Sequence, residues 1–165
     1  MTHALSRRAL LTTAGAVAVT ACTPKEAAAS EAQYATSPFR QMTDAQWRER
    51  LPRAAYDVLR HEATERPGSS PLNTEHRGGT FVCRGCDLPL FRSTWKYDSG
   101  TGWPSFYQAI AANVGTKTDF AIGFPRVEYH CARCLGHQGH IFDDGPRPTG
   151  KRYCNNGVAL TFQPA

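Results

Sequence analysis

The sequence contains no run of 18 or more apolar residues, so no segment of it is long enough to cross a bilayer as a helix. It has no internal repeat beyond two Cys-x-x-Cys pairs and no alternation of strand-like and helix-like segments, so a parallel sheet is not expected. Glycine and proline together supply 25 of the 165 residues, too few for a collagen-like or a wholly disordered chain. This length predicts one domain, with or without a tail.

The first 21 residues are expected to be a signal peptide. Arg7 and Arg8 precede a short, mildly apolar run at residues 9–21 that has no acidic residue, a pattern typical of secretory signals. Residues 6–11 resemble the twin-arginine export motif. Residues 19–22 resemble a bacterial lipobox, in which Cys22 becomes the lipidated first residue. An ordinary signal peptide cleaved near residue 21, or a cytosolic amphipathic tail, would also fit this composition.

An acylated Cys22 would anchor an exported, periplasmic protein to a membrane. Thr23 follows it, and the lack of aspartate there resembles the sorting signal for the outer rather than the inner membrane. Residues 22–38 are rich in Ala, Ser, Thr and Pro without apolar periodicity, so we interpret them as a flexible tether. Removing the two leader arginines lowers the net charge from +5 to +3 over 144 residues, which argues against a partner that is a nucleic acid.

The folded domain is expected over residues 39–165 and begins with short helices. Thr43 or Asp44 can cap a first helix that carries Trp47 on its apolar face, and Pro52 suits the start of a second. After residue 75 the segments become short, aromatic and β-branched, and turn residues separate them, which indicates an antiparallel β domain. The candidate strand segments are residues 79–83, 88–93, 118–131, 139–142, 151–154 and 157–162.

The Cys-x-x-Cys pairs predict a metal site, because two intervening residues let both thiolates of a pair point at one ion. Gly85 and Gly136 are expected to supply the backbone freedom of the two turns. Four thiolates make a closed, structural zinc site, so we predict one Zn²⁺ per chain. With 44 residues between the pairs, a whole sheet is expected to lie between them, its two ends clamped by the metal. The predicted ligands are Cys83, Cys86, Cys131 and Cys134. Disulfides in an oxidising compartment, or a redox pair, are the alternatives.

Cys154 remains once the lipidated cysteine and the four ligands are assigned. Arg152 lies two positions away and therefore on the same face of a strand, where a cation stabilises a thiolate. His137 and His140 lie upstream and can transfer protons near neutral pH. With Asn156, these residues form a candidate nucleophilic site. A small buried cysteine and a histidine pair that packs or binds metal are the alternatives.

Longer motifs make the sequence similar to the B-type peptide-methionine sulfoxide reductases. The likeness runs from about residue 47 to residue 162 and keeps the family's order of motifs, at residues 69–73, 99–106, 131–134, 137–146 and 150–156. This resemblance implies a mainly β domain of two antiparallel sheets, zinc-clamped in many members, with helices at the amino end. It also implies the reduction of methionine-R-sulfoxide, free or in proteins, to methionine.

The resemblance assigns roles as well. Cys154 would be the nucleophile, left as a sulfenic acid after one turnover, and Trp103 would form the hydrophobic pocket for the sulfoxide methyl group. Asp144 would orient a histidine. The residues that would shape the site, activate the nucleophile or help to protonate the sulfoxide oxygen are His137, His140, Arg152 and Asn156.

The sequence departs from the family pattern at four positions. Thr101 stands where many relatives carry a resolving cysteine, so the sulfenic acid must be reduced by an external small thiol or a thioredoxin-like protein. Gln138 replaces a leucine between the histidines, and Asn155 and Gly157 replace an isoleucine and a serine beside the nucleophile. These last changes leave the catalytic residues intact.

Three rival functions fit parts of the pattern. A zinc-clamped β domain that only binds proteins would not need Cys154. A thiol–disulfide oxidoreductase would need a second active cysteine beside it. A nucleic-acid-binding zinc ribbon conflicts with export and with the modest charge of the mature chain.

Overall fold

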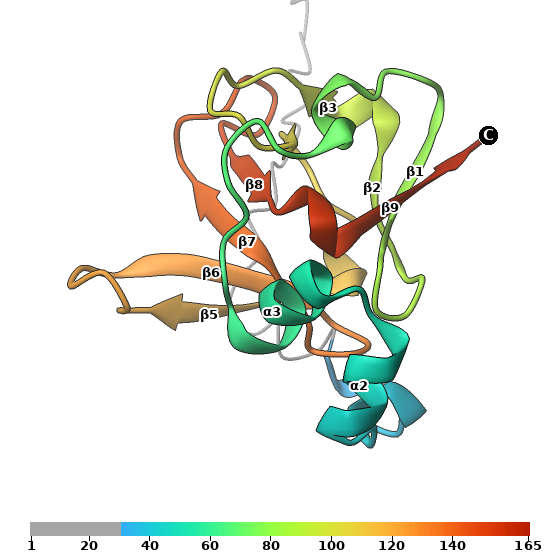
Figure 1. Ribbon diagram of the computed structural model, residues 1–165. Coiled ribbons are helices and arrows are strands. Elements are labelled where there is room, and N and C mark those ends of the chain that lie inside the picture. Colours follow the sequence, from blue (N-terminus) through green and yellow to red (C-terminus); the bar gives the residue numbers. More distant parts are fainter. Residues whose placement is uncertain (1–30) are drawn as a thin grey trace, which may run out of the picture.

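Two antiparallel sheets form most of the molecule (Figure 1). The protein is described from a computed structural model that covers residues 31–165. The smaller sheet has the order β2-β1-β9, with β1 at Gly79–Cys83, β2 at Pro89–Arg92 and β9 at Leu160–Pro164. The larger sheet has the order β3-β4-β8-β7-β6-β5. Its strands are β3 (Lys96–Tyr97), β4 (Ser105–Phe106), β5 (Val114–Asp119), β6 (Arg126–Cys131), β7 (His137–Phe142) and β8 (Arg152–Asn155). The predicted mainly β fold is confirmed.

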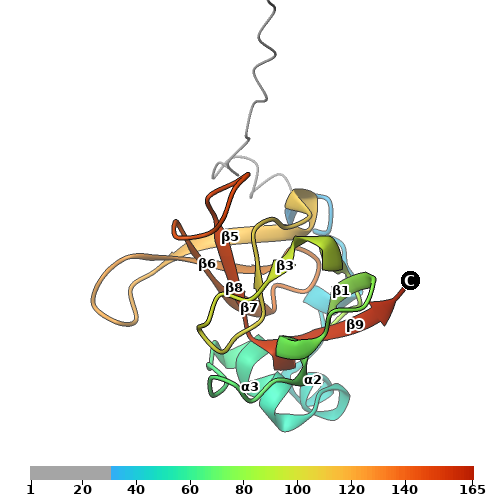
Figure 2. The ribbon, with the colours of Figure 1, turned by 90° about the horizontal axis from the view of Figure 1, so that it is seen from above.

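Two helices precede the sheets, as the sequence predicts, and pack against one side of them (Figure 2). Helix α2 spans Asp44–Arg50 and starts in a capping box, in which Thr43 and Gln46 bond each other's backbone N–H groups. Helix α3 spans Arg53–His61 and packs on β7 and on η5. The short 3₁₀ helices are η1 (Pro38–Arg40), η2 (Pro71–Thr74), η3 (Ser93–Trp95), η4 (Ala111–Asn113) and η5 (Gly157–Ala159).

Aromatic side chains fill the space between the sheets. The rings of Phe91 in β2 and Phe106 in β4 stack with centroids 4.1 Å apart, and Phe81 in β1 meets Phe106 edge-on at 5.0 Å. Tyr129 and Tyr153 add a second edge-on pair at 5.3 Å. Burying a phenylalanine side chain contributes about 1.5–3 kcal/mol, so this cluster holds the two sheets face to face.

The segment 118–131 forms more than one strand. It contains the end of β5, a turn and all of β6, because Gly123 takes a left-handed φ of 85° and donates its N–H to the carbonyl of Phe120. The short strands β3 and β4 were not among the predicted segments. Each is two residues long, and a strand of that length has no periodicity to detect.

Residues 31–38, which the sequence analysis assigns to a tether, contact the domain. Glu31 lies 3.0 Å from His130 Nε2, and the Tyr34 hydroxyl donates to Asn113 Oδ1 at 2.9 Å. The predicted signal peptide, Cys22 and residues 22–30 lie outside the described residues. In the part of the chain that the structure covers, no helix combines the length and apolar character that a membrane span requires.

Candidate active site and metal centre

Cys154 lies in β8 at the middle of the larger sheet. Across the ladder it is paired with Ser105 in β4 on one side and with His140 in β7 on the other. Residues directly opposite each other in antiparallel strands point to the same face. The Cys154 thiol is half-buried, so this face offers a nucleophile that a ligand can reach.

A cavity of about 140 Å³ opens beside the Cys154 thiol. Its lining residues are Thr64, Trp103, Arg126, Gly139, His140, Phe142, Cys154, Asn155 and Asn156. The cavity therefore combines two aromatic rings with a thiol and a histidine. A larger cavity, about 370 Å³, lies beside α2 and α3, but it contains no cysteine and adjoins none of the predicted catalytic residues.

One wall of the cavity is held by Glu65. Its backbone carbonyl accepts the indole N–H of Trp103 at 3.1 Å, and its backbone N–H donates to Asn156 Oδ1 at 3.0 Å. Its carboxylate accepts the N–H groups of Gly157 and Val158 at 2.6 and 2.9 Å. Asn156 thus shapes the site by fixing the wall that orients Trp103.

Arg152 contacts the nucleophile, as its position in the strand predicts. It also donates from Nε and Nη2 to both carboxylate oxygens of Asp144, at 2.8 and 2.9 Å. This pairing corrects the expectation that Asp144 orients a histidine, because a bidentate guanidinium–carboxylate contact engages both of its oxygens. Asp144 is therefore a partner of Arg152, and the hydrogen bond lowers the pKa of the Asp144 carboxyl.

The pKa of Cys154 results from opposing influences. Burial raises it, whereas the Arg152 charge and hydrogen bonds with Thr101 and Arg152 lower it. Burial is the largest influence, and the net shift is upward. The predicted stabilisation of the thiolate by Arg152 is present but is outweighed. In the free protein, Cys154 at neutral pH is consequently a thiol that carries its own proton.

Hydroxyl groups form a chain that ends at the nucleophile. Ser99 Oγ lies 2.7 Å from Ser105 Oγ and 2.8 Å from Thr101 Oγ1, and Thr101 bonds Cys154. Each hydroxyl has one proton to donate. Ser105 donates its proton to the carbonyl of Trp103 at 3.1 Å, so Ser99 is left to donate either to Ser105 or to Thr101. When Ser99 donates to Thr101, the Thr101 proton is left for Cys154.

His137 is held by a buried carboxylate. Its Nδ1 donates to Glu128 Oε1 at 2.7 Å, and the other oxygen of Glu128 accepts from His130 Nδ1 at 3.0 Å. Burial alone would raise the pKa of Glu128, but the two histidines outweigh burial and hold it at about 2. His137 Nε2 is buried and has no hydrogen-bond partner among the described residues.

His140 is held by a second carboxylate. Its Nε2 donates to Asp119 Oδ2 at 2.7 Å, and Arg126 donates to the same oxygen at 2.5 Å. Burial lowers the pKa of His140, and the hydrogen bond with Asp119 offsets part of that effect. The rings of His137 and His140 lie 5.4 Å apart. His140 is thus opposite Cys154 in the sheet, His137 lies next to His140, and both rings are fixed in orientation.

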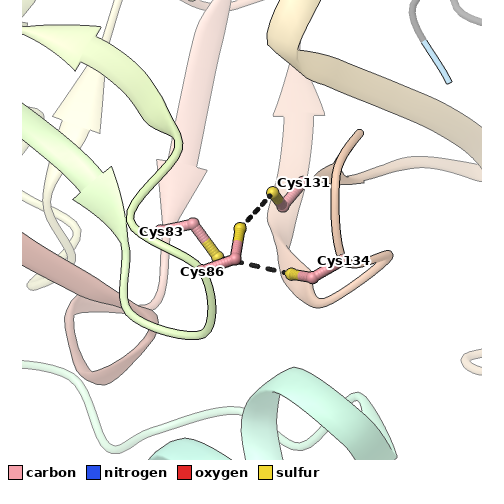
Figure 3. Close-up of side chains that lie close together, drawn as sticks. All are labelled: Cys83, Cys86, Cys131 and Cys134. Carbon is pink, nitrogen blue, oxygen red and sulfur yellow. Dashed lines mark hydrogen bonds between the residues drawn. The ribbon is translucent and has the colours of Figure 1, made fainter. Parts of the chain in front are cut away.

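The four cysteines of the Cys-x-x-Cys pairs meet in one buried cluster (Figure 3). Their sulfurs all lie within 4.8 Å of one another, with Cys83 and Cys134 3.6 Å apart and Cys86 and Cys131 3.4 Å apart. A tetrahedral zinc ion with bonds of 2.3 Å holds its sulfurs about 3.8 Å apart. The cluster fits such an ion, whereas disulfide bonds would bring sulfurs to about 2 Å.

The cluster joins the two sheets, because Cys83 ends β1 and Cys131 ends β6. This differs from the expected clamp on two ends of one sheet. The left-handed turn residues are Asp87 and Leu135, each with φ of 59°, and not Gly85 and Gly136. Glycine at 136 is needed for a close approach instead, since a Cβ there would lie 2.8 Å from a methyl group of Leu59.

Comparison with known proteins identifies the family. The SelR domain family matches residues 51–164 of the chain. Peptide methionine sulfoxide reductase MsrB of Bradyrhizobium diazoefficiens is 50% identical over 123 residues, 74% of this chain and 88% of the relative. MsrB of Thiobacillus denitrificans is 49% identical over 123 residues, 74% of this chain and 93% of the relative. The chain belongs to the MsrB family. Chloroplastic peptide methionine sulfoxide reductase B1 of Oryza sativa is 49% identical over 131 residues, which are 79% of this chain and 59% of that longer relative.

Two departures from the MsrB pattern meet in the structure. Gln138 and Asn155 are both fully buried, and the Asn155 amide donates to Gln138 Oε1 at 3.4 Å and to the carbonyl of Asn156 at 2.7 Å. The Tyr129 hydroxyl donates to Asn155 Oδ1 at 2.6 Å, and Gln138 Nε2 donates to the sulfur of Cys83 at 3.4 Å. The polar substitutions therefore satisfy each other and link the nucleophile's strand to the metal cluster.

Sequence reasoning singled out Cys154 and the two histidines but missed the carboxylates that hold the histidines. Glu128 and Asp119 lie in strands that reach the histidines only through the sheet register. A signal was present: Arg126, Glu128 and His130 alternate along one strand segment, which places three polar side chains on one face. When such a face is buried, each charged side chain on it needs a hydrogen-bonding or oppositely charged partner.

Proposed function

We propose that this MsrB-family chain reduces methionine-R-sulfoxide, free or in proteins, to methionine with Cys154 as the nucleophile. One observation carries the proposal: among the described cysteines, Cys154 alone lies outside the four-thiol cluster, and it faces a cavity lined by Trp103 and His140. A purely protein-binding domain would need neither the exposed thiol nor the fixed histidines. A thiol–disulfide oxidoreductase would need a second free cysteine near Cys154.

The cavity suits the end of one methionine sulfoxide side chain. At about 140 Å³ it accommodates a methyl group and a sulfoxide but little more. Trp103 and Phe142 offer apolar rings to the methyl group, and Arg126, whose buried Nε has no partner among the described residues, offers a donor to the sulfoxide oxygen. Fixed positions for the methyl group and the oxygen select one configuration at sulfur, which is why each epimer needs its own enzyme.

The reaction transfers one oxygen atom and two electrons. The sulfur–oxygen bond of the substrate breaks, the oxygen becomes bonded to Cys154 Sγ, and the thiol proton ends on that oxygen. The substrate sulfur is reduced to a thioether, and Cys154 is oxidised to a sulfenic acid. A proton donated to the oxygen makes it a better leaving group, and His140, which lines the cavity, can pass the Cys154 proton to it.

The sulfenic acid is proposed to be reduced by an external thiol. Two thiols of a small molecule or of a thioredoxin-like protein return Cys154 to the thiol, form one disulfide and release water. In support, Thr101 bonds Cys154 at the position where many relatives carry a resolving cysteine, and the remaining described cysteines are gathered in the metal cluster.

The metal and the leader belong to the same proposal. The cluster fits one structural Zn²⁺, which would stabilise the fold and take no part in the reaction. Residues 1–21 would direct twin-arginine export, Cys22 would carry the lipid, and residues 22–38 would connect the anchor to the domain in the periplasm. Detergent partitioning of the intact protein against Cys22→Ala tests the anchor, and equal partitioning into water would refute it.

The function is tested with epimer-resolved methionine sulfoxide, free and in a peptide, and dithiothreitol as reductant. We expect turnover of the R epimer only, and a loss of several orders of magnitude in Cys154→Ser, because the nucleophile is removed while the metal ligands remain. Unchanged turnover in Cys154→Ser, or turnover of the S epimer, would contradict the assignment. Circular dichroism and metal content of the variant provide the control for folding.

A further inference from the structure

The turn between β5 and β6 exposes three large apolar side chains within five residues. Phe120, Ile122 and Phe124 are 65%, 51% and 57% exposed, and we call these three residues the apolar tip. The hairpin that carries them projects from the body of the molecule (Figure 1). Exposed apolar side chains that cluster on a protein surface usually mark a binding site.

The apolar tip adjoins the cavity of the proposed active site. Asp119 and Arg126 are the last paired residues before the turn, so they form the base of the tip. Arg126 lines the cavity, and Asp119 holds His140, which lines it as well. The base of the hairpin therefore shares Arg126 with the cavity wall.

The size of the cavity determines what can cover the tip. A volume of about 140 Å³ holds the end of one side chain, so the residues on either side of a bound methionine sulfoxide must remain outside. An extended chain advances about 3.3 Å per residue. Two or three flanking residues therefore reach the surface next to the opening, where the hairpin stands. When a methionine sulfoxide side chain enters the cavity, its flanking residues are therefore brought to the apolar tip.

We infer that the apolar tip binds apolar residues that flank a methionine sulfoxide in an extended or unfolded segment of a substrate polypeptide. The inference rests on the proposed function and deepens it, because it specifies the kind of sequence around the oxidised residue. Methionine is usually buried among apolar residues. Its oxidation disrupts that packing, and the segments it releases carry apolar neighbours.

The test compares three substrates with the wild type and with Phe120→Ser/Ile122→Ser/Phe124→Ser. The substrates are free methionine-R-sulfoxide, a peptide with Leu and Phe on both sides of the sulfoxide, and a peptide with Gly and Ser there. We expect kcat/KM for the Leu/Phe peptide to fall about tenfold or more in the triple variant, mainly through KM. Values for the free amino acid and the Gly/Ser peptide are expected to stay within about twofold.

Leu135→Asn provides a matched control variant. Leu135 is an exposed apolar residue on another loop, and asparagine tolerates its left-handed backbone. This variant, with zinc content verified, should act on all three substrates as the wild type does. Equal kcat/KM for the Leu/Phe peptide in wild type and triple variant would overturn the inference alone. A wild type that is inactive on all three substrates would overturn the proposed function, and the inference with it.

Discussion

At the scale of single residues, the nucleophile depends on neighbours that act in opposite directions. Burial raises the pKa of Cys154, while Arg152 and Thr101 lower it. A half-buried thiol is less accessible to oxidants in solution. It also keeps the proton that the sulfoxide oxygen receives in the proposed reaction. The hydroxyl chain that ends at Thr101 sets how far the thiolate can be stabilised when the proton leaves.

Thr101→Val tests this chain. Valine keeps the shape but removes the hydroxyl that stabilises the thiolate, so we expect the pKa of Cys154 to rise further. Activity at pH 7 should fall several-fold and recover as the pH is raised, with the acid limb of the pH–rate profile shifted upward. The rate of Cys154 alkylation by iodoacetamide, followed by mass spectrometry across pH, measures the pKa directly. Thr101→Ser is the control and should keep the wild-type profile; an unshifted valine profile would contradict the role.

Glu128 makes the stability of the fold depend on pH in the acidic range. Its pKa is held at about 2, below the ordinary value near 4.5. A carboxyl with a lowered folded-state pKa stabilises the fold above pH 4.5, and that contribution disappears as the pH falls toward 2. The shift corresponds to stabilisation on the order of 3 kcal/mol.

We therefore expect Glu128→Gln to flatten the loss of stability between pH 5 and 3. Urea unfolding of wild type and variant at pH 6 and pH 3.5 gives the comparison, and loss of metal at low pH is common to both proteins. A variant whose free energy of unfolding falls with acid as steeply as that of the wild type would argue against this role of Glu128. Glu49→Gln, at an exposed position of α2, is the matched control for removing a carboxylate.

At the scale of elements, the polar pair on β7 and β8 shows how two departures from a family pattern compensate. Gln138 and Asn155 replace apolar residues, and alone each would bury an unsatisfied amide. Asn155 donates to Gln138 and to a backbone carbonyl, and Gln138 donates to a metal-cluster thiol. The strand with the nucleophile and the strand with the histidines are joined by side chains as well as by backbone.

A double-mutant cycle measures that compensation. We expect Gln138→Leu and Asn155→Ile each to lower the free energy of unfolding by about 1–3 kcal/mol, because each leaves a buried polar partner unpaired. The double variant should be more stable than the sum of the single changes predicts, by about 1 kcal/mol. Chemical denaturation at fixed metal content provides the numbers. Strictly additive losses would mean that the two side chains do not interact.

Elements also mark where prediction from sequence succeeds. The Cys-x-x-Cys pairs, the Thr43 cap and the strand at residues 79–83 are local patterns, and the structure contains all three. The partners of the histidines and the target of Asp144 depend on register between strands distant in sequence, which no local pattern encodes. The hydroxyl chain was missed because a serine and a threonine next to Gly100 and Gly102 look like ordinary turn residues.

At the scale of the whole molecule, the cysteine cluster connects the two sheets. One pair of ligands follows β1 in the smaller sheet, and the other follows β6 in the larger one. The aromatic core also holds these sheets together, so metal and core act on the same interface. The nucleophile lies in β8, outside both ligand loops.

Removal of the metal is therefore expected to affect stability before it affects chemistry. Freshly purified protein should contain about one zinc per chain. Chelation under reducing conditions, or Cys134→Ser, should lower the melting temperature by more than 10 °C, because metal binding is linked to folding. Calorimetry with metal analysis measures both quantities. Full stability after complete metal loss would remove the structural role assigned to the cluster.

The order of the strands in the smaller sheet affects how the protein can be made. β1 is the central strand, and its second neighbour, β9, contains the last strand residues of the chain. During synthesis one edge of β1 stays unpaired until residues 160–164 leave the ribosome. An open edge pairs readily with another chain, so nascent copies on one messenger are exposed to mispairing until β9 has emerged. Shortening the chain by its last six residues would make that transient condition permanent.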